Sequence, residues 1–200
     1  MLFAVAAVLC PASVFAQAMG VANLKCEYQR QPLGVQQSHP SLSWEITSGQ
    51  RNTAQIAYQV LVAQSLKQLA QNLGEVWNSG KVTSGASIQV RYAGQALQPA
   101  HTYYWKVKTW DNHGGASAWS APAQWQMGLL APADWRGARW IAYEPLPAER
   151  VNVLPVDGAK DTYRDNNTLP LLRKSFSTKK QPTKATLFIS GLGQFEAVLN

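Results

Sequence analysis

The chain has 200 residues, a formal net charge of +7, two cysteines, and 46% hydrophobic residues. The basic residues are scattered along the sequence without a groove-reading motif, so we expect no nucleic-acid partner. Cys26 is the one cysteine outside the first 16 residues, which excludes a disulfide scaffold and leaves stability to a core rich in Trp, Tyr and Phe.

Residues 1–16 predict a secretory signal peptide. The run from Leu2 to Leu9 is apolar, Pro11 interrupts it, and Ala16 precedes a cleavage point. Because the segment is shorter than the roughly 20 apolar residues of a spanning helix, we expect no membrane span. The positively charged n-region is missing, so the charge would come from the amino terminus or from an upstream start. The alternatives are a buried first element and, less favoured, a lipoprotein at Cys10. We expect export, to the periplasm or the medium.

Residues 20–128 predict an antiparallel β-sandwich, because short alternating segments are separated by turn signals. The strongest segment is His101–Trp110, in which Tyr103 and Trp105 share one face and Tyr104 and Lys106 the other. The other expected strands are Leu42–Ile46, Ile56–Ala63, Val76–Trp77, Ser87–Tyr92 and Trp119–Met127. Leucines at helical spacing predict one short helix over Ser65–Leu73, ended by Gly74.

The segment from Leu97 to Tyr103 is typical of a tyrosine corner, in which a Tyr at the start of a late strand bonds back to the preceding loop. With Pro40–Trp44, Tyr104–Val107 and Ala118–Pro122, this segment resembles a fibronectin type III module. A generic immunoglobulin-like sandwich is the alternative, and it would change little functionally.

A second unit is expected after residue 128. Residues 129–137 form a Pro-punctuated linker, and residues 138–142 predict a strand. Residues 144–170 are irregular. Strands are expected again at residues 171–176, 184–190 and 194–200. Because the final strand has no following partner in this sequence, we expect residues 138–200 to be the start of a truncated second β-sandwich.

No motif in the sequence predicts an active site. The eleven Asp and Glu residues cannot be paired from sequence into the facing carboxylates of a glycosidase. Asp157, Asp161 and Asp165 lack the spacing of a calcium loop, and the histidines at 39, 101 and 113 are isolated. The Gly191–Gly193 segment predicts a hairpin turn, since no helix pattern follows it. We therefore expect no catalytic residue, no metal and no cofactor, and ligand-binding residues stay unknown.

Three aromatic residues stand apart from the expected core. Tyr104 and Trp110 point outward in the strand pattern and, with Trp119, could form a sugar-stacking platform. Packing between modules or within the core is the favoured interpretation.

The second half of the chain carries a more specific family resemblance. Residues 138–141, 171–176 and above all 185–200 (ATLFISGLGQFEAVLN) resemble the N-terminal region of bacterial α-L-rhamnosidases, glycoside hydrolase family 78. In that family a fibronectin-like domain precedes a β-sandwich. The resemblance implies that catalytic carboxylates lie in a downstream (α/α)6 barrel, so no catalytic residue can be transferred to this chain.

The resemblance implies that the parent enzyme cleaves terminal α-L-rhamnose from glycosides or polysaccharides with inversion, and that this chain supplies accessory modules. The alternative hypothesis is a fibronectin-like carbohydrate-binding or adhesion protein without enzymatic activity. The oligomeric state is not predictable from this sequence.

Overall fold

The computed structural model describes residues 19–142 and 170–199. The chain forms two compact units, unit 1 (Met1–Asp134) and unit 2 (Trp135–Asn200). The predicted signal peptide, residues 1–16, lies outside the described residues. The predicted domain boundaries at residues 128 and 138 stay predictions.

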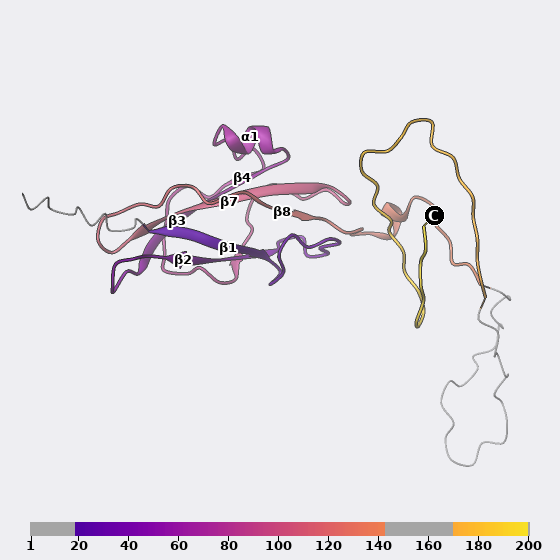
Figure 1. The fold of residues 1–200 in the computed structure, drawn as a ribbon, viewed down its shortest axis with the longest axis horizontal. Coiled ribbons are helices and arrows are strands. Elements are labelled where there is room, and N and C mark those ends of the chain that lie inside the picture. The colour runs from indigo at the N-terminus through magenta and orange to yellow at the C-terminus, as the bar shows by residue number, and fades with distance from the viewer. Residues whose placement is uncertain (1–18, 143–169, 200) are drawn as a thin grey trace, which may run out of the picture. The chain divides into compact units, whose positions relative to one another are not determined.

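Unit 1 is an antiparallel β-sandwich of two sheets (Figure 1). The smaller sheet has the order β1-β2-β6, and the larger has the order β4-β3-β7-β8 with β5 also paired to β3. The smaller sheet contains β1 (Gly20–Cys26), β2 (Ser41–Thr47) and β6 (Val90–Arg91). The larger contains β3 (Gln55–Ala63), β4 (Trp77–Asn78), β5 (Val82–Thr83), β7 (Thr102–Asp111) and β8 (Ala123–Gln126). Two short helices follow strands: α1 (Leu66–Ala70) and the 3-10 helix η1 (Pro132–Trp135).

The core lies between the two sheets, as the period of two in β7 requires. Tyr103, Trp105 and Val107 point inward from β7 and are almost fully buried. They meet Trp44 from β2 and Trp125 from β8 in one apolar cluster. The predicted all-β sandwich is therefore confirmed. No helix within the described ranges is long and apolar enough to cross a membrane.

The predicted tyrosine corner is present. The backbone N–H of Gln98 donates to the Tyr103 hydroxyl at 2.8 Å, and the Tyr103 ring stacks on Trp125 with centroids 5.6 Å apart. One side chain thus ties the loop before β7 to the centre of the core.

Replacing Tyr103 by phenylalanine should keep the packing and remove the acceptor for Gln98. We expect a loss of about 1 kcal/mol in the free energy of unfolding, the usual net value of one hydrogen bond. Urea denaturation measures it, with Tyr104→Phe on the outer face of the same strand as the control. An equal loss in both variants would mean that the corner bond contributes nothing of its own.

Two predicted strands are shorter than expected. Trp119–Met127 becomes strand only from Ala123, because the N–H groups of Val107 and Thr109 donate to the hydroxyls of Ser120 and Ser117 instead of to backbone carbonyls. Ser87–Tyr92 is reduced to β6, because Gln89 takes a left-handed backbone (φ 56°) that interrupts an extended strand. Hydrogen bonds to serine hydroxyls thus shorten the first strand, and one residue with a positive φ shortens the second.

The strands predicted at residues 138–142, 171–176, 184–190 and 194–199 are not observed in the described part of unit 2, so this part of the prediction was wrong for those residues. They carry alternating apolar side chains, but these are exposed, as for Leu187 and Val198. A strand exists only when its N–H and C=O groups pair with a neighbour, and alternation alone does not supply that pairing. Leu192 and Gly193 form a bend, with φ 98° at Gly193, at the turn predicted there.

Candidate functional site

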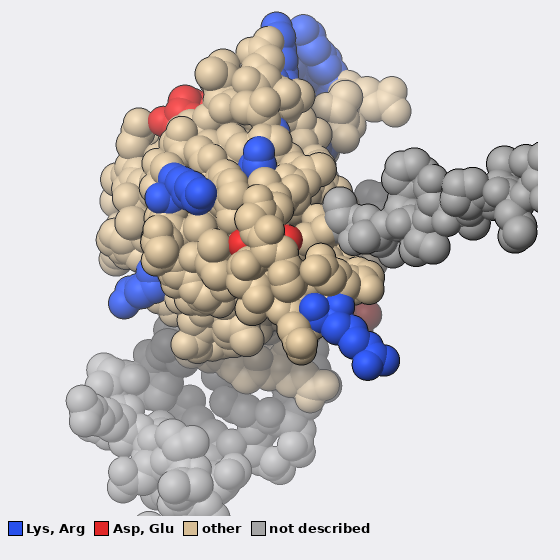
Figure 2. All heavy atoms as spheres, turned by 90° about the vertical axis from the view of Figure 1, so that its left-hand side faces the viewer, with Lys and Arg blue, Asp and Glu red and all other residues tan. Residues whose placement is uncertain are grey.

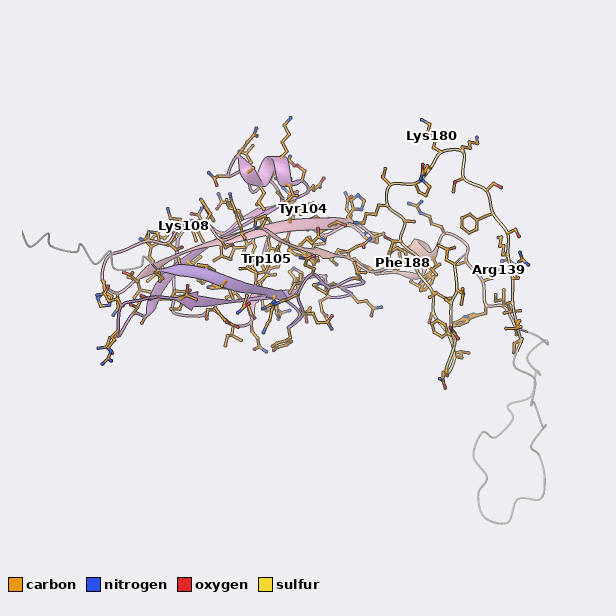
Figure 3. All side chains as sticks on the ribbon, viewed as in Figure 1. Tyr104, Trp105, Lys108, Arg139, Lys180 and Phe188 are labelled. Atoms are coloured by element: carbon orange, nitrogen blue, oxygen red, sulfur yellow. The ribbon has the colours of Figure 1, made fainter. Side chains whose placement is uncertain are left out.

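The outer face of the larger sheet carries the functional candidates of unit 1. Tyr104, Lys106, Lys108 and Trp110 alternate along β7 with the buried core residues and therefore point away from the core. Figure 3 shows Tyr104 and Lys108 on this side of β7, whereas Trp105 lies on the core side. The predicted division of β7 into two faces is confirmed.

Helix α1 covers one half of this face (Figure 1). Ser65 caps the helix by accepting a hydrogen bond from the Gln68 N–H, which satisfies a donor left free at a helix start. Leu69 of the helix then packs with Leu61 and Ala63 of β3 in a second apolar cluster. Tyr104 and Trp119 pack against this cluster as well. Their favoured interpretation as packing residues is confirmed.

Lys106 belongs to the half of the outer face that α1 covers. Its ammonium donates to Asn72 Oδ1 at 2.6 Å and lies 5.0 Å from the Trp119 ring centroid. The residue is only 7% exposed, and burial lowers the pKa of its ammonium because the charged form loses hydration. The amide oxygen and the aromatic face offset part of that loss, so Lys106 fastens the loop after α1 to the sheet.

The other half of the face, near Trp110, is not covered by α1. The ammonium of Lys81 lies 4.6 Å from the Trp110 ring centroid, and that of Lys108 lies 5.5 Å from it. Ala57 faces Trp110 across the ladder from β3. Two positive charges thus share one partly exposed aromatic ring.

The three aromatic residues considered as a platform therefore do not act together. Tyr104 and Trp119 belong to the half under α1, whereas Trp110 lies at the other end of β7 with its two lysines. The sequence pattern could supply Lys108, two positions from Trp110 on the same face. The sequence pattern did not indicate that Lys81, which lies between β4 and β5, would approach Trp110.

The described carboxylates of unit 1 serve local structure. Asp111 Oδ1 accepts from the N–H groups of His113 and Gly115, and Asp134 Oδ2 accepts from those of Leu130 and Ala131. Each of the remaining three also accepts a hydrogen bond: Glu27 from the Ser41 N–H, Glu45 from the Asn23 amide, and Glu75 from the Gln64 N–H. These bonds fix turns and strand edges.

Residues 19–142 and 170–199 contain no group of three or more His, Cys, Asp or Glu side chains that could hold a metal ion. Asp157, Asp161 and Asp165 lie outside the described residues. The His101 ring nitrogen Nδ1 lies 3.1 Å from the Pro99 carbonyl, inside the tyrosine corner, as expected for a structural residue. His39 contacts the Ser38 hydroxyl at 3.0 Å.

Cys26 is a free, buried thiol. Burial, with a smaller contribution from the Glu27 charge, raises its pKa to about 12. Because the thiolate is the nucleophile, Cys26 should react slowly with thiol reagents in the folded protein.

In a Cys10→Ser background, we expect Cys26 to resist iodoacetamide between pH 7 and 10 while folded and to react fully in 6 M guanidinium. Mass spectrometry of the alkylated chain measures both states. Rapid alkylation of the folded chain at pH 8 would contradict the buried, protonated thiol.

The chain is similar to a known domain family and to several known proteins. A family model described as the N-terminal immunoglobulin domain of Rha78A-like proteins matches residues 21–131. An α-L-rhamnosidase of Streptomyces avermitilis is 45% identical over 62% of this chain, and one of Formosa agariphila is 35% identical over 84%. The crystal structure of the Streptomyces avermitilis enzyme, complexed with L-rhamnose, superposes on 62% of this chain with a TM-score of 0.59.

The chain spans only a small part of these relatives. It covers 12% of the Streptomyces avermitilis protein and 18% of the Formosa agariphila protein. In the crystal structure the match covers 12% of that chain. The relatives therefore share with this chain only a small part of their own length, and the match to the Formosa agariphila protein extends beyond unit 1.

Proposed function

Because this chain belongs to the family of Rha78A-like N-terminal immunoglobulin domains, we propose that it is the non-catalytic N-terminal part of an α-L-rhamnosidase. The observation that carries this proposal is the combination of high identity and small coverage. The sandwich is 45% identical to a relative named α-L-rhamnosidase, yet it corresponds to 12% of that protein. In this proposal the chemistry belongs to residues that the present chain does not contain.

The substrate of the parent protein is proposed to be a glycoside or polysaccharide with terminal α-L-rhamnose. The described carboxylates of unit 1 are consistent with catalytic residues that lie outside this chain, because their oxygens accept hydrogen bonds within turns and strand edges. An inverting glycosidase needs two carboxyl groups roughly 6.5–9.5 Å apart across the sugar, with room for a water molecule. Unit 1 would contribute positioning and solubility rather than bond cleavage.

Export is a further part of the proposal. It is supported by the apolar run of residues 2–9 and the absence of charge before Lys25. Expression with a C-terminal tag, cell fractionation and N-terminal sequencing test it. A mature terminus at or near Gln17 outside the cytoplasm is expected, and an intact Met1 in the cytoplasm would contradict export.

The gene itself tests the accessory role. We expect the reading frame to continue beyond Asn200 for several hundred residues with repeated helical hairpin patterns, as an (α/α)6 barrel requires. A frame that continues instead into further sandwich repeats or a surface anchor would favour an adhesion protein and contradict the proposal.

A further inference from the structure

The uncovered half of the outer face has the composition of a binding surface. We define the Trp110 patch as five side chains that share this half: Gln59, Asn78, Lys81, Lys108 and Trp110. Ala57, which is only 2% exposed, belongs to the floor of the patch. Helix α1 packs on the opposite half of the same face, over Leu61 and Ala63. The ladder gives the patch a rigid floor, because Trp110 faces Ala57 and Lys108 faces Gln59 in directly opposed pairs of β3 and β7.

The charge of the patch is unbalanced. Neither Lys81 nor Lys108 has a carboxylate ion-pair partner among the described residues, and the unit 1 carboxylates are engaged elsewhere with backbone N–H groups or with the Asn23 amide. The Trp110 ring attracts both ammonium groups but cannot neutralise them. An anion placed between them would gain from both charges, and the neighbouring Asp111 carboxylate is held by the N–H groups of His113 and Gly115.

The patch also offers groups that suit a sugar. Trp110 provides a partly exposed aromatic surface, and the Gln59 amide, which donates to Asn78 Oδ1 at 2.9 Å, lies in the neighbouring rung. A hexuronate has its carboxylate attached directly to the sugar ring. A carboxylate paired with the two ammonium groups that lie over the Trp110 ring would therefore hold the sugar ring next to the indole.

We propose that the Trp110 patch binds acidic oligosaccharides that contain uronic acids, with Lys81 and Lys108 pairing the carboxylate and Trp110 contacting the sugar ring. The patch lies within unit 1, so this proposal does not depend on the rhamnosidase activity of the parent protein. A substrate-anchoring role for the sandwich would rest in addition on the proposed function.

Isothermal titration of the 200-residue chain tests the proposal with three hexasaccharides: hexagalacturonate, neutral galactohexaose and a sulfated carrageenan oligomer. We expect hexagalacturonate to bind, the neutral oligomer to bind at least about tenfold more weakly, and added salt to weaken the complex. Lys81→Gln and Lys108→Gln should each raise Kd about tenfold, since hydrogen bonds to charged groups are the strong ones. Trp110→Ala should do the same.

Lys67→Gln is the matched control, because it removes the same charge from an exposed position on α1. Its Kd should equal that of the parent chain. Thermal denaturation of Trp110→Ala separates misfolding from lost contact, and the two lysine variants keep the test valid if that variant unfolds. The proposal is overturned by absence of hexagalacturonate binding, by an equal effect of Lys67→Gln, or by equal affinity for the sulfated oligomer, which would indicate unspecific attraction of anions.

Discussion

Replacing Trp125 by alanine is expected to lower the free energy of unfolding by about 3–5 kcal/mol, the usual loss when a large aromatic side chain is removed from a core. Trp125 is fully buried on β8. It stacks on Tyr103, and its ring meets Tyr92 edge-on with centroids 6.3 Å apart. Its indole N–H also points to the sulfur of Met127 at 3.2 Å. The cavity would open where both sheets meet, so neighbouring side chains could fill it only in part.

Urea denaturation followed by circular dichroism measures this loss. Trp140→Ala is the control, because Trp140 is 67% exposed and its removal should change stability by no more than about 0.5 kcal/mol. For a domain with roughly 5–15 kcal/mol in total, the Trp125 variant should unfold at a much lower urea concentration. A change below about 1 kcal/mol would contradict the packing of Trp125 at the centre of the sandwich.

Gln55→Leu should give the second large effect, although the side chains have similar size. The Gln55 amide oxygen accepts from the Trp44 indole N–H at 2.9 Å, and its nitrogen donates to the carbonyls of Ser84 and Ala86. Leucine would leave the Trp44 N–H without an acceptor at a site that is 2% exposed. An unsatisfied buried donor costs about 1–3 kcal/mol, and the loop at 84–86 would also lose its attachment.

The same denaturation assay measures the Gln55 variant, with Gln37→Leu at an exposed position as the control. We also expect proteolysis to cut first within residues 84–86 of the Gln55 variant, because local opening precedes cleavage. If Gln55→Leu were as stable as the control, the buried amide would not be holding the two segments together.

The long strands were predictable from sequence because packing and pattern agree in them. In β7, Trp105, Val107 and Thr109 alternate with Lys106 and Lys108 over the middle of the strand, so one face had to be buried. The observed β7 and β3 differ from the expected ranges by a residue at most. The Leu97–Tyr103 corner was predictable for a related reason, since Tyr at a strand start needs a nearby partner for its hydroxyl.

Strand β1 was not predicted, because its pattern is broken locally. The register with β2 shifts between Ala22 and Lys25, and Asn23 has a positive φ of 51°. A bulge of this kind changes the faces of the following side chains and hides the alternation. The turn after β1 is equally hard to read, since Glu27 and Tyr28 take left-handed backbone angles that usually indicate Gly or Asn.

The Trp110 patch was only partly predictable. Trp110 and Lys108 share a strand, so sequence alternation places them on one face. Lys81 follows β4 and approaches across β3, and the distance between a lysine and an aromatic ring on different strands depends on sheet order. The half of the outer face under α1 was also only partly predictable. The helix pattern was visible, but nothing in the sequence said that Leu69 would bury Leu61 and Ala63 on the outer face.

We propose that this chain is an accessory part without catalytic activity, and its activity on an aryl rhamnoside can be assayed. The purified 200-residue chain is incubated with p-nitrophenyl α-L-rhamnopyranoside, and p-nitrophenol release is followed by absorbance next to a mock purification from cells without the gene. We predict a rate equal to that of the mock sample at every pH from 4 to 9. Release above the mock rate that increases in proportion to the concentration of the chain would show that the chain itself is catalytic.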